Sequence, residues 1–256
     1  MRRARRPVAD TTLVSSEVKG LGEYRWLSFD VVGTLIDFEA GIVGAVREIA
    51  TASGVEVDDQ RVLESFGSAE GEQQHSTPQL PFTQMLDPVY RRMAAELGLP
   101  TGMEERAALR KSIPDWPAFP DAVEAMAELG ERYRLVALTN ADNWALDRMA
   151  TTLGSPFHDS VTAEDVGFNK PDPQVFAYCA GRQSAHGYTR DGWLHVAQSQ
   201  YHDIATAKAM GVTTCWIERR RNKAGFGATP SPAALIEPDY HYSSLAELAS
   251  ATREFR

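Results

Sequence analysis

Short, mostly apolar segments alternate with amphipathic segments along much of the chain. Four such runs, each of four or five residues, predict buried strands at 26–29, 135–138, 193–197 and 213–217. Apolar residues three or four positions apart predict helices between them, at 121–129, 143–153 and 201–210. Strands that are apolar on both faces and separated by helices are typical of a parallel sheet covered by helices. The fold class predicted for this part of the chain is therefore α/β.

Residues 39–112 break this alternation. They contain several helical stretches, such as 82–97 with its apolar positions Met85, Val89 and Met93, and no convincing strand. This pattern indicates a helical domain inserted into the α/β core.

The domain boundaries follow from these patterns. We expect a core formed by residues 24–38 and 116–256, and an inserted helical domain at 39–115. Prolines 114, 117 and 120 restrict the backbone and predict a hinge-like linker between the two parts. Residues 1–23, which begin with a cluster of arginines, are expected to be a flexible solvated tail.

Composition and charge narrow the class of function. Of 256 residues, 43% are hydrophobic and 24% are charged, the balance of a soluble globular protein. The net charge of -9 disfavours general binding to nucleic acid or to an anionic membrane. No apolar run is long enough to span a membrane, and the basic N-terminus lacks the apolar stretch of a signal peptide. We therefore expect a cytoplasmic protein that acts on a small molecule.

Neither the cysteines nor the histidines of the sequence indicate a metal or disulfide site. Cys179 and Cys215 are far apart and lack zinc-ligand spacing, and His195 and His202 belong to no HExxH motif. We expect both histidines to be partly buried or surface side chains.

Polar residues directly follow several predicted strands. In an open α/β sheet, ligands bind beyond the carboxyl ends of the strands. The polar residues selected on this ground supply two carboxylates, hydroxyl and amide groups, and an ammonium. They are Asp30, Thr34, Thr139, Asn140, Lys170 and Asp203. A carboxylate nucleophile must be oriented and dehydrated while its charge is supported, and Lys170 can give that support. Alternatively, Thr34 caps a turn and Asn140 caps the helix at 143–153.

Four ordered motifs resemble those of the haloacid dehalogenase superfamily, most closely its L-2-haloacid dehalogenase branch. They are Phe29-Asp30-Val31-Val32-Gly33-Thr34-Leu35, Leu138-Thr139-Asn140, Lys170-Pro171-Asp172 and Asp203. The resemblance covers roughly residues 24–250. It implies a Rossmann-like core with an inserted helical cap domain, and Asp30 as a nucleophile that forms a covalent aspartyl intermediate.

Two positions separate this chain from the phosphatases of that superfamily. Phosphatases usually carry an aspartate two residues after the nucleophile and an acidic pair near the fourth motif, where this chain has Val32 and Gln198. The leaving-group acid and one magnesium ligand are thus missing. A halide leaves as a stable anion without a general acid, so displacement at carbon with no cofactor is favoured, and Mg²⁺ is expected only if the protein is a phosphatase.

The dehalogenase resemblance implies a role for each candidate residue. Asp30 attacks the α-carbon of a small carboxylate, Lys170 supports it, and Asp203 activates the water that cleaves the ester. The remaining candidates bind the substrate carboxylate or line the pocket: Thr139, Asn140, Val32, Ser199, Gln200 and Trp144. Trp144 is as readily interpreted as a residue that packs at the start of a helix.

Some positions depart from the dehalogenase pattern and leave alternatives open. That branch typically has an aromatic residue where this chain has Val32, a tyrosine at Phe176, an asparagine at Gln200, and an arginine in the cap that receives the halide. Residues 65–70 contain no basic residue, although Arg61 is close.

Three acidic residues expected at the entrance of the insert leave the substrate open as well. They indicate either an amine-bearing substrate or solvated helix faces, and they are Glu39, Glu70 and Glu72. Two further alternatives remain, a phosphatase with altered motifs and a non-catalytic binding protein. A homodimer is compatible with the sequence, which names neither substrate nor leaving group.

Overall fold

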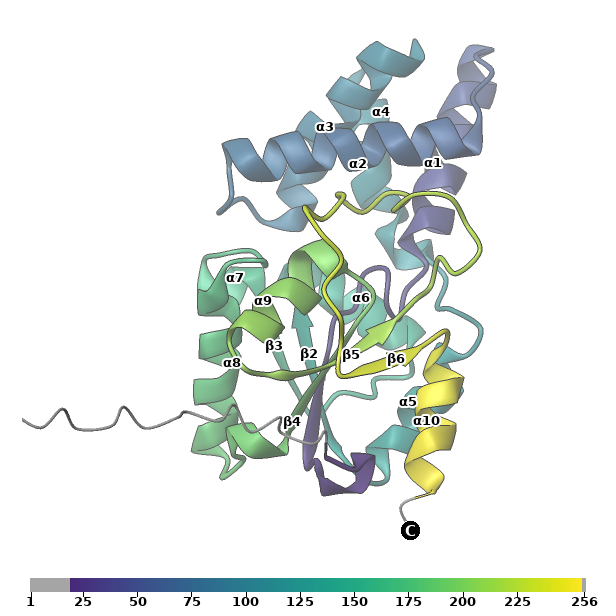
Figure 1. The fold of residues 1–256 in the computed structure, drawn as a ribbon. Helices are drawn as coiled ribbons and strands as arrows, with labels where there is room; N and C mark the ends of the chain where they lie inside the picture. The colour runs from purple at the N-terminus through teal and green to yellow at the C-terminus, as the bar shows by residue number, and fades with distance from the viewer. Residues whose placement is uncertain (1–18, 255–256) are drawn as a thin grey trace, which may run out of the picture.

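A parallel sheet of six strands forms the centre of the computed structural model, which describes residues 19–254 (Figure 1). The strand order is β3-β2-β1-β4-β5-β6, and every neighbouring pair is parallel. The strands are β1 (Trp26–Phe29), β2 (Arg134–Thr139), β3 (Asp159–Thr162), β4 (Trp193–Ala197), β5 (Thr213–Ile217) and β6 (Tyr240–Tyr242). This architecture confirms the predicted α/β fold with a Rossmann-like core.

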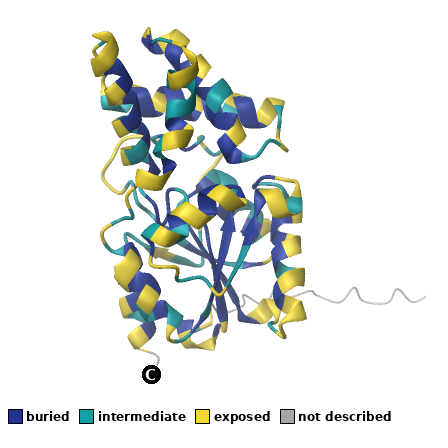
Figure 2. Cartoon of the chain, turned by 180° about the vertical axis from the view of Figure 1, so that it is seen from behind, coloured by how far each residue is buried: buried dark blue, intermediate teal, exposed yellow. Residues whose placement is uncertain are grey.

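Alternate residues of the central strands pack into two different apolar clusters. Leu135 and Ala137 of β2 face one cluster, and Val136 and Leu138 face the other. Helices α5 (Ala122–Gly130), α6 (Asn143–Thr152) and α10 (Leu245–Arg253) contribute to the first cluster, whereas α8 (Pro173–Ala185) and α9 (Ala205–Ala209) contribute to the second. Figure 2 shows the strands as almost wholly buried and the outer helix faces as exposed. Burial on both faces explains why the strand sequences are continuously apolar.

Four helices form a separate layer beyond the carboxyl ends of the strands (Figure 1). They are α1 (Phe38–Ser53), α2 (Asp59–Ser76), α3 (Phe82–Leu97) and α4 (Met103–Ser112), and we call them the helical insert. The remaining short elements are helix α7 (Ala163–Val166), the 3₁₀ turns Leu21–Glu23, Ile113–Asp115 and Arg190–Gly192, and a π-helical turn at Gln200–Ile204.

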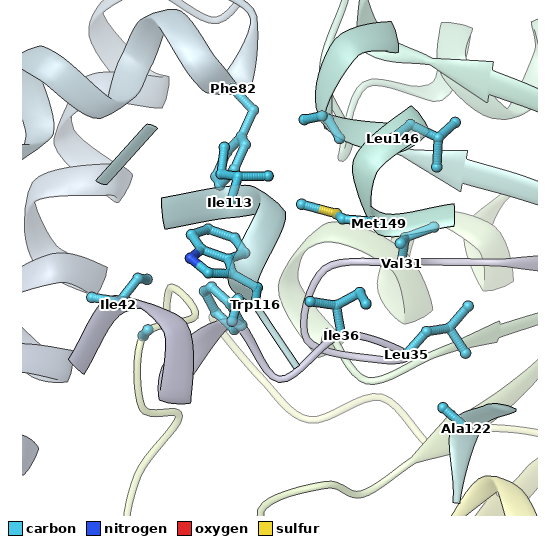
Figure 3. Packing of buried hydrophobic residues seen from close by; sticks show 14 of the residues in the cluster. Val31, Leu35, Ile36, Ile42, Phe82, Ile113, Trp116, Ala122, Leu146 and Met149 are labelled. Atoms are coloured by element: carbon cyan, nitrogen blue, oxygen red, sulfur yellow. The ribbon is translucent and has the colours of Figure 1, made fainter. Parts of the chain in front are cut away.

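The helical insert packs on the core through one continuous apolar cluster. Figure 3 shows Ile113 and Trp116 lying between Ile42 and Phe82 of the insert and Met149 of the core. Trp116 is only 1% exposed, and its indole N–H donates to Ser112 at 2.9 Å. Because this contact is apolar and closely packed, it fixes the insert above the strand ends.

Several elements differ from the sequence-based predictions. The helix predicted at 82–97 has the predicted bounds, but strands β3 and β6 were not predicted because both are short and rich in polar residues. The helix predicted at 201–210 begins with the π-helical turn. The expected tail ends earlier than predicted, since Leu21–Glu23 is helical and Leu21 is buried; residues 1–18 lie outside the described part of the chain.

Between residues 19 and 254, no helix combines the length and apolar character needed to cross a membrane.

Candidate active site

Asp30 follows β1 at the centre of the sheet, and both of its carboxylate oxygens are held. Oδ1 accepts a hydrogen bond from Lys170 Nζ at 3.0 Å, and Oδ2 accepts one from the Thr34 hydroxyl at 2.7 Å. The backbone N–H of Asp30 donates to Val196 of the neighbouring strand β4. The side chain is therefore oriented by three elements, as nucleophilic attack requires.

The loop after β1 places Thr34 against Asp30. Backbone N–H groups of residues 34–36 all donate to the carbonyl of Val31, which closes a tight turn. Gly33 has φ of +89°, a conformation that only glycine adopts without strain. The Thr34 hydroxyl donates to Asp30 and accepts from the N–H of Gln198 at 2.8 Å. Thr34 thus acts as more than a turn cap, because it links the nucleophile to the loop after β4.

Lys170 is buried, with 1% exposure, and all three of its N–H donors are used. They donate to Asp30 at 3.0 Å, to Asp203 at 2.6 Å and to the carbonyl of Leu138 at 2.8 Å. The side chain of Asn140 holds the backbone of Lys170 from both sides, accepting from its N–H at 2.6 Å and donating to its carbonyl at 2.9 Å. In this arrangement Lys170 positions Asp30 and has no donor left for a substrate.

A buried polar network supports Asp203 from behind. Asp203 Oδ1 accepts from Lys170 and, at 2.9 Å, from Nε2 of His195. Because an ionised carboxylate can only accept, the His195 proton is assigned to Nε2, and Nδ1 then accepts from the Ser28 hydroxyl at 2.7 Å. Ser28 in turn accepts from the indole N–H of Trp193. The network connects the nucleophile to the interior of the sheet.

The electrostatics of the three charged groups follow from their burial and proximity. Burial raises the pKa of Asp30, and the attraction of Lys170 only partly offsets that rise. Burial alone would also raise the pKa of Asp203, but Lys170 and the His195 hydrogen bond lower it to about 2. Burial opposes the charge of Lys170, yet the two carboxylates raise its pKa. Asp203 and Lys170 are therefore a fixed ion pair at neutral pH.

Asp30 opens onto a small cavity between the core and the helical insert. Its volume is about 40 Å³, room for on the order of three water-sized groups. The lining residues from outside the insert, which we call the core wall, are Asp30, Val32, Thr139, Asn140, Ala141, Lys170, Gln198, Ser199, His202 and Thr229. Those from the insert, which we call the insert wall, are Phe38, Glu70, Gln74 and Phe82.

The insert wall brings a second carboxyl group to the nucleophile. Glu70 of α2 is 6% exposed, and burial together with the charge of Asp30 raises its pKa to about 8. Within residues 19–254, no hydrogen-bonding or ion-pair partner faces its carboxyl group. One turn along the same helix, Gln74 Oε1 lies 2.9 Å from Nε2 of His202. Glu70 is accordingly protonated at neutral pH.

His202 joins the two walls as a neutral side chain. Burial lowers its pKa to about 4. Its Nε2 meets Gln74 of the insert, and its Nδ1 lies 3.1 Å from the Ser199 hydroxyl. His202 therefore helps to seat the insert on the core.

The structure brings most of the predicted site residues together. Val32, Thr139, Asn140 and Ser199 line the cavity with Asp30 and Lys170. The Thr139 oxygen accepts from the N–H of Ala141 at 3.1 Å, which leaves its own O–H available to a ligand. By contrast, the Asn140 amide holds Lys170, so its side chain is already committed.

Four predicted site residues do not reach the cavity wall, and one of them, Thr34, holds Asp30 through its hydroxyl without lining the cavity. Asp203 is 0% exposed and lies behind Lys170. The amide of Gln200 is hydrogen-bonded to the backbone of Ile236, away from the cavity. Trp144 is 36% exposed and is faced by the guanidinium of Arg110, 4.9 Å from its ring. The packing interpretation of Trp144 is therefore the one that the structure supports, and Gln200 is a structural residue.

The three acidic residues expected at the entrance of the insert have different surroundings. Glu39 pairs with Arg220 of the long connection after β5, whereas Glu72 has a side chain that is 68% exposed. Only Glu70 lines the cavity. Arg61, considered from the sequence as a cation for the leaving group, donates instead to the Glu96 carbonyl. The interpretation as solvated helix faces thus fits Glu72 but is wrong for Glu70 and for Glu39, whose side chain is only 15% exposed.

The donor set does not fit magnesium, which some members of the superfamily require. Mg²⁺ binds oxygen ligands in octahedral geometry, commonly one or two carboxylates with waters. Here Lys170 occupies the space between the carboxylates of Asp30 and Asp203. Throughout residues 19–254, no group of three or more His, Cys, Asp or Glu side chains is arranged to hold a metal ion.

Sequence reasoning missed several residues of this site. Gln74, Phe38 and Phe82 lie on helices whose facing side no sequence motif indicates. The buried position of His195 carried one weak signal, a polar residue within an otherwise apolar strand.

Comparisons with known proteins agree with this geometry. A family model for haloacid dehalogenase-like hydrolases matches residues 24–189, more than half of the chain. The defluorinating L-2-haloacid dehalogenase Rha0230 has a similar structure, with TM-score 0.75 and 20% identity over 90% of this chain and 95% of that one. Magnesium-bound YfnB from Bacillus subtilis has a TM-score of 0.73 and 20% identity, and the match covers 90% of this chain and 99% of that one. L-2-haloacid dehalogenase from Xanthobacter autotrophicus has a TM-score of 0.68 and 17% identity, and the match covers 91% of this chain and 100% of that one. No curated protein matches the sequence.

Proposed function

Because this chain belongs to the haloacid dehalogenase-like hydrolase family, we propose that it cleaves a carbon–heteroatom bond of a small 2-substituted carboxylic acid through an ester on Asp30. The observation that carries the proposal is the buried carboxylate of Asp30, held on both oxygens and supported by Lys170 at the wall of a small cavity. A carboxylate in that state is oriented and shielded from water, the two conditions that make it a competent nucleophile.

The cavity supports a small substrate. A volume of about 40 Å³ excludes a sugar or nucleotide but accommodates a few non-hydrogen atoms. The free O–H of Thr139 can donate to a substrate carboxylate at the carboxyl end of β2. Proteins described as L-2-haloacid dehalogenases share the fold, and their substrate class is of this size.

The reaction proceeds in two steps. An Asp30 oxygen attacks the α-carbon, a C–O bond forms, and the bond to the leaving group breaks with its electron pair. Water then adds to the carbonyl carbon of the Asp30 ester, the acyl–oxygen bond breaks, and a 2-hydroxy acid is released with an oxygen that came from Asp30. Lys170 and Thr34 orient Asp30 for the first step.

Asp203 is assigned a supporting role in this proposal. Its Oδ1 holds Lys170 and accepts from His195, and its low pKa makes it a weak base. That Asp203 activates water stays a prediction from the sequence, and an Asp203→Asn variant distinguishes the two roles.

The experiment follows the first turnover in heavy-oxygen water. Purified protein is incubated with 2-bromopropionate in excess chelator, and the product and the intact protein are analysed by mass spectrometry. We expect unlabelled oxygen in the first product and label in Asp30 after many turnovers. Asp30→Asn, which keeps the shape of the side chain, is the inactive control.

Three outcomes would contradict the proposal. Label in the first product shows direct attack by water, and hydrolysis of an aryl phosphate that requires Mg²⁺ shows a phosphatase. An inert protein that binds small carboxylates without any Asp30 adduct indicates a binding function.

A further inference from the structure

We infer that Glu70 is a further catalytic residue, which protonates the leaving group while Asp30 attacks and then accepts a proton from the hydrolytic water. This inference rests on the proposed function and deepens it. It assigns the substrate class more narrowly, to 2-substituted carboxylic acids whose leaving atom, such as fluorine or oxygen, needs a proton to depart.

The placement of Glu70 is the first argument. Asp30 lies on the core wall and Glu70 on the insert wall of one cavity, and they are close enough that the charge of Asp30 helps to raise the pKa of Glu70. A substrate between the walls meets the nucleophile on one side and the carboxyl group on the other. Displacement at carbon is in line, so the leaving group departs on the side opposite the nucleophile. An acid that protonates the leaving group must therefore lie on that side.

The environment of Glu70 supplies the second argument. Among the described residues, Lys170 is the only cation that lines the cavity, and its three donors are committed to Asp30, Asp203 and Leu138. An ionised Glu70 would therefore be a buried charge without compensation, so the carboxyl group keeps its proton. It is a proton donor in the resting protein.

The chemistry of the core wall leaves this role vacant. Val32 occupies the position two residues after the nucleophile and has no proton to give. Bromide and chloride depart unaided, whereas fluoride and oxygen anions are poor leaving groups unless protonated. An acid on the insert wall thus extends the reaction to bonds that an apolar position 32 alone could not cleave.

The protons balance over the whole cycle. In the first step the C–O bond to Asp30 forms, the carbon–leaving-group bond breaks, and the leaving group departs with the Glu70 proton. In the second step water adds to the ester, one of its protons ends in the 2-hydroxy acid, and the other returns to Glu70. Both steps use only substrate, water and these two side chains.

The switch from acid to base follows from the charge of Asp30. Burial and the Asp30 charge together raise the pKa of Glu70. Esterification neutralises Asp30 and removes that repulsion, which favours the carboxylate of Glu70 when a base is needed. The same side chain can therefore serve both steps, as a single carboxyl group does in retaining glycosidases.

The other titratable groups of the cavity do not compete for this role. Lys170 stays charged between two carboxylates, and the pKa of His202 lies at about 4, so its titration is complete well below neutral pH. The acid limb of the pH–activity profile is assigned to Asp30, whose pKa is raised and which must be ionised to attack. The alkaline limb, near the pKa of about 8, belongs to Glu70.

The test compares two leaving groups in two variants. Adduct formation on Asp30 and product release are measured with 2-bromopropionate and 2-fluoropropionate for wild type, Glu70→Gln and Glu72→Gln. Glu72 is the matched control, because it is an exposed carboxylate on the same helix. Adduct formation from the bromo compound also reports that each variant is folded and that Asp30 is a nucleophile.

We expect Glu70→Gln to lower adduct formation from the fluoro compound on the order of a hundredfold and from the bromo compound by less than about threefold. With the bromo compound the Asp30 ester should then persist in Glu70→Gln. The alkaline limb assigned to Glu70 should also disappear from the pH profile of this variant's activity. Glu72→Gln should match the wild type in every measurement.

Each contrary result has one meaning. If wild type forms no adduct with either compound, the proposed function is wrong and this inference is wrong with it. If wild type forms the adduct and Glu70→Gln forms and hydrolyses it equally well with both compounds, only the role of Glu70 is overturned. An equal loss with both leaving groups would also overturn it, because that result indicates a general structural effect.

Discussion

The two walls of the cavity differ in how completely their polar atoms are paired. On the core wall, Asp30 accepts on both oxygens and Lys170 donates through all three protons. On the insert wall, Phe38 and Phe82 are apolar, and Glu70 has no hydrogen bond to the described residues. The core wall is a rigid, pre-formed nucleophile site, whereas the insert wall has a carboxyl group free to act on a ligand.

This difference separates two tasks. A network of hydrogen bonds to both of its oxygens holds the nucleophile in one geometry and needs no reorganisation during reaction. An unsatisfied group lowers stability and is retained where a ligand uses it. We therefore expect substitutions on the core wall to affect every substrate equally, and those on the insert wall to discriminate between substrates.

The largest expected effect is that of Lys170→Ala. Removing the ammonium leaves Asp30 and Asp203 buried without compensation, so we expect adduct formation to fall about a thousandfold with every leaving group. Intact-protein mass spectrometry over time measures it, with Lys111→Ala on the exposed face of α4 as control. Equal rates in Lys170→Ala and wild type would show that the core wall does not depend on this network.

Glu70→Gln tests the insert wall through stability. The pKa of Glu70 is about 8 in the folded protein and near 4.5 in the unfolded chain, so the stability associated with its proton is full below about pH 4.5 and is lost as pH rises to about 8. The glutamine variant lacks this loss. The difference in free energy of unfolding between Glu70→Gln and wild type should therefore be larger at about pH 8 than at about pH 5, by on the order of 4 kcal/mol.

Urea unfolding at the two pH values measures this difference. Glu72→Gln provides the reference, since its exposed carboxylate should leave the pH dependence of wild type unchanged. A Glu70→Gln protein with the same pH dependence as wild type would contradict the protonated state assigned to Glu70.

Asp203→Asn sharpens the comparison from behind the core wall, where Asp203 holds Lys170. If Asp203 holds Lys170, its amide variant should slow adduct formation on the order of a hundredfold while hydrolysis of any ester that forms continues. Rapid-quench mass spectrometry separates the two steps. Rapid formation of an Asp30 ester that then persists would instead support the sequence-based prediction that Asp203 activates water.

Thr139→Val should have the smallest effect. The substitution keeps the shape of the side chain and removes the O–H proposed to bind the substrate carboxylate, which is worth about 1.4 kcal/mol, or a tenfold rise in KM. Steady-state kinetics with 2-bromopropionate measures it, and Thr151→Val on the exposed face of α6 is the control. An unchanged KM would remove Thr139 from the binding site.

Local signals were sufficient for the core. The apolar runs at β1, β4 and β5 have the predicted bounds, and parallel strands necessarily bring their carboxyl ends to one edge. Asp30 was therefore expected at this edge, and Lys170, which follows no predicted strand, was expected beside it from the motif Lys170-Pro171-Asp172, 140 residues away in sequence. The short strands β3 and β6 escaped prediction because their polar residues lack a strand pattern and are placed by pairing with β2 and β5.

The sequence by itself determined the α/β core, the helical character of the insert and the nucleophile with its lysine, because strand ends and helical periodicity are local properties of the chain. Only the tertiary structure decided which side of each insert helix faces Asp30. Glu70 and Glu72 are two residues apart on α2 and so point to different sides of the helix. Apolar positions such as Phe66 and Ala69 place Glu70 on the packed side, but nothing in the local sequence says that this side faces Asp30. The apolar contact around Trp116 and the rest of the packing between insert and core decide it: they place Glu70 at the cavity and leave Glu72 in solvent.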